Sequence, residues 1–330
     1  GVGLVGSEMC IRDSERGVLT TCNYVARGYG IHSAMSSKRA MQLCKDLIIL
    51  PVDITKYKEA SKEIFKIFKC YTKKIEPVSI DEAYLDVSSS NYCGGDPEEM
   101  ARQIRSCIKN DFKITASAGI SSNKLVAKIC SDWKKPDNQF SICDDEIKEF
   151  MTNVHLKKIP GIGKVNFEKC KKLNMQMCDD MYNLSIGELV RLFGSYGSSL
   201  YNLIRGIDHR EVEENRVRKS ISVEDTFIND LREIRSCTDK ITILYSKLIG
   251  RCNDSNISAS AAKEIFLKIK FSDFETITRQ KKCDTLSVNN FIDLFTNNII
   301  KVEKPIRLLG IGFKLKEKEN DSDQYDIFNR

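Results

Sequence analysis

The sequence has only three histidines, and none of its thirteen cysteines lies at a Cys-x-x-Cys spacing from another. Structural zinc sites draw on cysteine and histidine ligands at such short spacings, so we expect no zinc site. The cysteines are scattered singly from Cys10 to Cys283, and no secretion signal is visible. We therefore expect reduced, partly buried thiols in a cytosol rather than disulfides. The sequence also has no apolar run of about 18 residues, which argues against a membrane span.

The overall composition is that of a folded chain with a basic bias. At 330 residues the chain is long enough for two or more domains of roughly 150 residues each. Its hydrophobic content of 41% is ordinary, and its formal net charge is +6. A basic balance suits a polyanionic partner without identifying one.

The most informative stretch is Ser-Ile-Asp-Glu-Ala-Tyr-Leu-Asp, from Ser79 to Asp86. The residues around it favour β-structure, which predicts a strand that buries apolar side chains and presents Asp81 and Glu82 at one end or edge. Mg²⁺ prefers hard oxygen ligands and commonly shares one or two carboxylates with substrate phosphates. The alternative is an acidic turn in a β-hairpin with no metal.

Further motifs flank this stretch in a fixed order. They are Asn23–Met35 (NYVARGYGIHSAM), Thr115–Lys124 (TASAGISSNK), Ala127-Lys128, Lys135-Pro136, Ile159–Lys164 (IPGIGK) and Arg218-Lys219-Ser220. In order and spacing the set resembles the Y family of translesion DNA polymerases, in its bacterial branch. The resemblance runs from about Glu15 to the C-terminus.

This resemblance implies an α+β multidomain fold. Its parts are a ferredoxin-like palm, small fingers, a helical thumb with a helix-hairpin-helix, and a βαββαβ little-finger domain. The expected ranges are 15–51 for the fingers, 52–143 for the palm, 144–215 for the thumb, 218–318 for the little finger and 319–330 for a flexible tail. Local patterns predict helices over 36–44, 54–72, from 96 onward, 123–133, 231–251 and 287–300. They predict strands over 114–120, 220–227, 265–271, 276–282 and 308–316.

The first fourteen residues do not fit the family pattern. A Y-family polymerase opens with a strand that carries an aspartate, followed by a helix whose aromatic residue screens out ribonucleotides, and this sequence has neither. Residues 5–14 (VGSEMCIRDS) instead resemble translated sequencing-adapter DNA. We therefore interpret residues 1–14 as a non-native segment and leave them out of the fold prediction; the alternative is a divergent but natural N-terminus. Under either interpretation we do not expect Glu8 or Asp13 to replace the aspartate.

The resemblance also assigns chemical roles. Asp81 and Glu82 would be the catalytic carboxylates that hold two Mg²⁺ ions for nucleotidyl transfer. Asp86 is expected to be structural. The expected contacts to the nucleotide triphosphate are Thr21, Tyr24, Arg27 and Lys135. Tyr24 and Arg27 are three residues apart, so a helix would place them on one side.

Two regions are expected to bind DNA. In the Ile159–Lys164 motif, Gly161 and Gly163 would let backbone N–H groups approach a phosphate at a helix N-terminus, with Lys164 adding charge. Arg218 and Lys219 precede a little-finger strand. Lysines at 268, 270, 314 and 316 alternate along two other strands, which suits a DNA backbone or, alternatively, an ordinary solvated sheet face.

The chain ends in Gln324-Tyr325-Asp326-Ile327-Phe328, which resembles the peptide that bacterial replication proteins insert into the sliding clamp. Gln324, Ile327 and Phe328 would be its anchors, on a disordered tail that raises the local enzyme concentration at the primer end.

Together these features predict an error-prone, DNA-directed DNA polymerase of DNA damage tolerance and repair. Its partners would be primer–template DNA, deoxynucleoside triphosphates, two Mg²⁺ ions and the sliding clamp. We expect a monomer in the bacterial cytoplasm, without a membrane. Two alternatives remain: a catalytically impaired DNA- and clamp-binding fragment of such a polymerase, and a helix-hairpin-helix repair nuclease.

Overall fold

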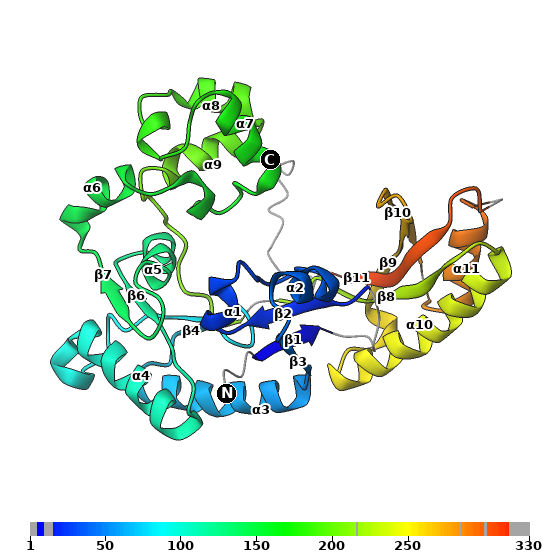
Figure 1. Ribbon diagram of the computed structural model, residues 1–330, viewed down its shortest axis with the longest axis horizontal. Coiled ribbons are helices and arrows are strands. Elements are labelled where there is room, and N and C mark those ends of the chain that lie inside the picture. The colour runs from blue at the N-terminus through cyan, green and yellow to red at the C-terminus, as the bar shows by residue number, and fades with distance from the viewer. Residues whose placement is uncertain (1–4, 10–15, 216, 284, 300–301, 317–330) are drawn as a thin grey trace, which may run out of the picture. The chain divides into compact units, whose positions relative to one another are not determined.

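The computed structural model describes residues 5–9, 16–215, 217–283, 285–299 and 302–316 (Figure 1). The chain forms two compact units. One combines Gly1–Val52 with Val217–Arg330, and the other is Asp53–Arg216. None of the helices in the described ranges is long and apolar enough to cross a membrane.

The N-terminal part of the first unit is a three-stranded sheet with two short helices. Its order is β2 (Val18–Cys22), β1 (Val5–Met9), β3 (Ile48–Pro51), and the helices are α1 (Tyr24–Gly28) and α2 (Ser37–Leu43). Leu19, Ala26, Ile31 and Ala40 form its buried core. Ser36 caps α2, because its side chain accepts a hydrogen bond from the Arg39 N–H.

Strand β1 belongs to residues 1–14, the segment that our fold prediction left out. It is the middle strand of this sheet, antiparallel to β2 and parallel to β3. Sheet pairing uses backbone N–H and C=O groups, which every non-proline residue carries whatever its side chain. The pairing therefore does not depend on the origin of these residues, and their non-native origin stays a prediction.

The second unit begins with the expected palm elements. These are α3 (Ile54–Tyr71), β4 (Ile75–Pro77), β5 (Ala83–Leu85), α4 (Pro97–Phe112), β6 (Ala118–Ile120), α5 (Lys124–Ser131) and β7 (Gln139–Ser141). The strand predicted over 114–120 is shorter than expected, since only its last three residues pair.

These strands do not form one sheet. β4 pairs with β5 antiparallel and β6 pairs with β7 parallel, as two separate two-stranded sheets. A ferredoxin-like palm needs a first strand to join such halves, and no described residue of this unit supplies it. In keeping with this, α3 has no fully buried residue, and β5 and β6 are only half-buried. The palm helix α3 and strands β5 and β6 therefore stay partly exposed to solvent.

The thumb follows as a cluster of short helices. These are α6 (Ile147–Thr152), α7 (Lys164–Lys172), α8 (Ile186–Phe193) and α9 (Tyr196–Leu203), with 3₁₀ turns at Asp144–Glu146, Leu156–Lys158 and Asp179–Met181. Their core also includes Leu125, Val126 and Ile129 of α5. The palm helix α5 is thus held by the thumb core.

The little-finger domain matches the predicted βαββαβ order. It consists of β8 (Ser220–Leu231), α10 (Ile234–Asp254), β9 (Ala262–Phe271), β10 (Thr276–Lys282), α11 (Val288–Thr296) and β11 (Ile306–Leu315). The sheet order is β10-β9-β11-β8, with every neighbouring pair antiparallel. Phe291, Phe295 and Phe313 are fully buried between this sheet and its helices.

Several cysteines are buried as free thiols. Cys130, Cys178 and Cys237 are buried, and burial raises the pKa of each thiol to about 12. Cys70 and Cys143 are exposed instead. The buried thiols therefore act as small apolar core residues rather than as reactive groups.

Candidate active site

Asp81 and Glu82 lie in the turn of a β-hairpin, between β4 and β5. The N–H groups of Val78 and Ser79 both donate to the Glu82 carbonyl oxygen, at 2.9 and 3.2 Å, and close this turn. The two carboxylates therefore directly precede β5, at the end of the strand, as we predicted. The strand begins one residue later, and Val78 and Ile80 are exposed rather than buried. The acidic-turn alternative describes the backbone correctly.

The two carboxylates have different partners. Asp81 Oδ1 accepts a hydrogen bond from the Ser79 hydroxyl at 2.5 Å. Glu82 Oε1 forms an ion pair with Lys128 Nζ at 2.5 Å, and both side chains stay about 40% exposed (40% and 38%). Adjacent, accessible carboxylates fit a Mg²⁺ ion that completes its coordination with water and substrate phosphate. No cluster of three or more His, Cys, Asp or Glu ligands occurs among the described residues.

Helix α5 fastens this hairpin through Lys124. Lys124 Nζ pairs with Glu76 Oε2 at 2.5 Å and donates to the Glu211 carbonyl at 2.9 Å, and it lies 5.2 Å from the Tyr84 ring centroid. Burial alone would raise the pKa of Glu76, but the hydrogen bonds from the Glu213 N–H and from Lys124 outweigh it and lower that pKa. Lys124 is 9% exposed, so it serves packing rather than phosphate contact.

Asp86 has the structural role we predicted for it. Its carboxylate accepts a hydrogen bond from the Ser88 N–H at 3.0 Å and pairs with Lys74 at 3.2 Å. The pKa of Asp86 is lowered, chiefly by hydrogen bonding from Ser88. These contacts close the turn that follows β5.

The residues expected to contact the triphosphate lie in both units. Thr21, Tyr24 and Arg27 are exposed where β2 meets α1, with the Arg27 guanidinium 5.6 Å from the Tyr24 ring centroid. The prediction that Tyr24 and Arg27 share one side of a helix is confirmed. Lys135 belongs to the second unit and pairs with Asp132 at 2.6 Å.

The Ile159–Lys164 motif forms a hairpin ahead of α7. Gly161 has φ +91°, and a Cβ there would lie 2.6 Å from the Tyr196 ring, so this glycine is required by local packing. Gly163 caps α7 and has open space around it. Lys164 is exposed, as is Val165, at 83%. The helix N-terminus at Gly163 is therefore accessible to a phosphate.

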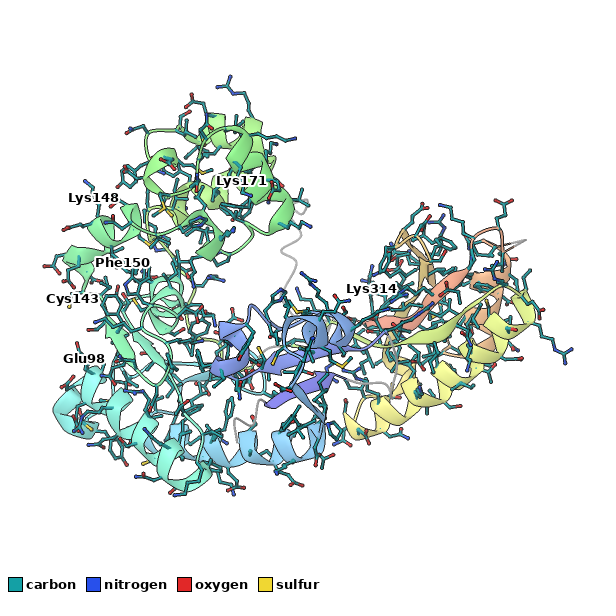
Figure 2. All side chains as sticks on the ribbon, viewed as in Figure 1. Glu98, Cys143, Lys148, Phe150, Lys171 and Lys314 are labelled. Atoms are coloured by element: carbon teal, nitrogen blue, oxygen red, sulfur yellow. The ribbon has the colours of Figure 1, made fainter. Side chains whose placement is uncertain are left out.

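Of the little-finger lysines, Lys268, Lys270 and Lys314 lie on the sheet, Lys316 directly follows β11, and several form ion pairs. Lys268 pairs with Glu224 at 2.8 Å, and Lys314 pairs with Glu264 at 2.7 Å. Figure 2 shows Lys314 on this sheet and Lys171 on the thumb. Arg218 donates to Ser255 Oγ at 2.8 Å. The acidic partners offset part of the positive charge that the lysine spacing predicts.

Comparison with known proteins identifies the family. A family model described as impB/mucB/samB matches residues 2–132, its C-terminal domain matches residues 218–327, and a DNA polymerase-iota thumb-domain model matches residues 157–208. DNA polymerase IV of Pseudomonas fluorescens is 42% identical over 329 residues, which cover 99% of this chain and 93% of that protein. DNA polymerase IV of Ralstonia nicotianae is 37% identical over 327 residues, which cover 98% and 91%. The chain belongs to the Y family of DNA polymerases.

Solved structures of Y-family polymerases have the same fold. A Dbh–Dpo4–Dbh chimera superposes with a TM-score of 0.83 at 26% identity, covering 95% of this chain and 92% of the chimera. An insertion ternary complex of Dbh DNA polymerase gives a TM-score of 0.63 at 25% identity, covering 94% and 91%. The chain is thus a DNA-directed DNA polymerase of the translesion type, with a helix-hairpin-helix thumb and a little-finger domain.

Sequence reasoning missed one functional partnership of this Y-family palm. Lys124 and Lys128 are four residues apart, so their common helix face could be expected. Their partners Glu76 and Glu82 are more than forty positions away in sequence, and only the fold brings them together. The residues predicted to bind the clamp, Gln324, Ile327 and Phe328, lie outside the described residues, as does Asp13.

Proposed function

We propose that this Y-family member adds deoxynucleotides to a primer 3′ end by two-metal nucleotidyl transfer at Asp81 and Glu82. The observation that supports this most is the β4–β5 turn, which presents two adjacent carboxylates with Lys128 beside them. When bound, two Mg²⁺ ions would lower the pKa of the primer hydroxyl and neutralise charge on the departing pyrophosphate. Asp81 and Glu82 would hold these ions through their carboxylate oxygens.

The triphosphate would be oriented by residues with hydroxyl and cationic groups. Thr21 and Tyr24 offer hydroxyls, and the Arg27 guanidinium can bond two phosphate oxygens at once. Lys135 would add a fourth contact after exchanging its Asp132 partner for phosphate. Because their hydroxyl and cationic groups would act on the triphosphate, these residues should affect nucleotide affinity more than DNA affinity.

DNA would be held without sequence preference. Gly161 and Gly163 would shape the thumb hairpin so that backbone N–H groups and Lys164 meet a backbone phosphate. Arg218 and Lys219 would add contacts from the little finger. The Gln324, Ile327 and Phe328 peptide would tether a monomeric polymerase to the sliding clamp in the bacterial cytoplasm, during error-prone tolerance and repair of damaged DNA.

Removing divalent metal tests the proposed chemistry. We expect EDTA to abolish single-nucleotide addition to a primer and excess Mg²⁺ to restore it, because the carboxylates alone supply no Lewis acid. Primer–template binding, followed by fluorescence anisotropy in the same buffers, should change little, since thumb and little-finger contacts to phosphate need no metal.

Other outcomes of this assay would favour other functions. Intact primer–template binding with no addition at any Mg²⁺ concentration would favour the non-catalytic DNA- and clamp-binding alternative. Strand cleavage would favour a nuclease. Addition that continues unchanged in EDTA would contradict the two-metal mechanism.

A further inference from the structure

The side chain that contacts Glu82 is a lysine from another element. Lys128 lies on α5, and its ammonium bonds Glu82 Oε1 at 2.5 Å. Glu82 and Lys128 are 46 positions apart in sequence, so local chain geometry does not impose this contact. It follows from how α5 is packed against the hairpin.

Helix α5 is fixed at several points, so Lys128 cannot move away with its backbone. Leu125 and Ile129 are buried in the thumb core, and the Leu125 N–H donates to Asp208 Oδ2 at 3.0 Å. One turn before Lys128, the buried Lys124 holds Glu76 of the same hairpin. Lys128 therefore stays within reach of Glu82 whenever the hairpin is folded.

From this geometry we infer that Lys128 competes with the divalent cation for Glu82. This rests on the proposed role of Glu82 as a metal ligand. A carboxylate oxygen that accepts from an ammonium must exchange that partner before it coordinates a metal ion, and the nearby positive charge repels the incoming cation. Lys128 is thus a positioning residue: it holds Glu82 oriented before metal binds and weakens the binding of metal alone.

The same exchange links metal binding to the nucleotide. Once Glu82 coordinates the cation, the ammonium of Lys128 loses the carboxylate it bonds, and its other anionic neighbour, Asp132, is already paired with Lys135. A triphosphate brought with the metal offers a new one, since its oxygens are strong acceptors for lysine. Metal alone would therefore bind weakly, while metal with nucleotide would bind well. The site therefore binds metal and nucleotide together in preference to metal alone.

The test is Mn²⁺ binding by the full chain, measured by electron paramagnetic resonance of the free ion, without DNA or nucleotide. We expect K128M to tighten Mn²⁺ binding by about three- to tenfold, the range for loss of a partly exposed ion pair and its repulsion. K128R keeps the positive charge and a similar side-chain length, so its Mn²⁺ affinity should equal that of the unchanged chain. K148M removes a charge from the exposed Lys148 on α6 (Figure 2) and should have no effect.

A double-mutant cycle separates competition at Glu82 from general repulsion. E82Q should weaken Mn²⁺ binding, and adding K128M to E82Q should then give no tightening. Equal tightening in both backgrounds would overturn the inference, because it would mean that Lys128 acts only as a distant charge. If E82Q weakens binding but K128M does not tighten it, only this inference fails. If E82Q has no effect, the proposed role of Glu82 fails as well.

Discussion

Gly119→Ala is expected to lower the free energy of unfolding by about 3 kcal/mol, because overpacking against backbone cannot be relieved by a side-chain movement. Gly119 lies in β6, and a Cβ there would come 1.9 Å from the Ala127 carbonyl oxygen and 2.3 Å from the Ser131 nitrogen. Both atoms belong to the backbone of α5, so strand and helix would have to separate. Chemical denaturation followed by circular dichroism measures the effect.

Gly187 provides the matched control in the same unit. It lies in α8, and the nearest atom to a Cβ there is Ser185 Oγ at 4.0 Å. Alanine is favoured over glycine inside a helix by up to about 1 kcal/mol, so Gly187→Ala should leave stability unchanged or slightly raised. Equal destabilisation by both substitutions would contradict the close β6–α5 packing described above.

A grafted first palm strand is expected to raise Mg²⁺-dependent primer extension by at least about a hundredfold, the scale of restoring one electrostatic contribution to a transition state. Glu82 and Asp86 make their backbone hydrogen bonds toward the β4 side, so Ala83 and Leu85 present theirs at the opposite edge of β5. No described strand pairs there. A strand with a metal-binding aspartate would cover the half-buried palm layer and add a third carboxylate.

The graft can be taken from a relative. Residues 1–14 would be replaced by the N-terminal segment of the Pseudomonas fluorescens relative, up to the point where the fingers begin. The control is the same graft with the aspartate of its first strand changed to asparagine, which should restore folding of the palm without the gain in rate. Extension by the unchanged chain at the rate of the graft would show that the palm needs no such strand.

The little finger is the part of the fold that the sequence predicted best. Strand β10 spans Thr276–Lys282, the range that its alternating sequence pattern predicts. Helices α10 and α11 lie within a few residues of their predicted ranges. Most elements there have a clear buried face because sheet and helices pack on one core, although β10 is exposed except at the partly buried Ile277. Under that condition hydrophobic periodicity reports the structure directly.

The palm was predicted less well, for a related reason. The apolar residues Val78, Ile80 and Ile114 suggested longer strands, but all three are exposed. A strand needs a pairing partner as well as a suitable composition. Each described palm strand pairs with only one other strand, β4 with β5 and β6 with β7. The sequence pattern therefore describes a completed palm better than the sheet halves observed.

Within the candidate site, residue types were easier to predict than their partners. The carboxylates of Asp81 and Glu82 stand out by their motif. The ion pair between Glu82 and Lys128 and the anchoring of Glu76 by the buried Lys124 depend on how α5 packs on the hairpin. Gly161 was expected to serve phosphate, yet the Tyr196 ring already requires a glycine there.

The most direct test of the catalytic assignment is the single-turnover rate of nucleotide addition by Asp81→Asn, measured in the chain that carries the grafted strand. Asp86→Asn is the matched control, because Asp86 is a neighbouring carboxylate held by Ser88 and Lys74. We predict a loss of about a thousandfold for Asp81→Asn, with primer–template affinity unchanged, and little loss for Asp86→Asn. Equal rates for Asp81→Asn and the parent would contradict the assignment of Asp81 as a catalytic metal ligand.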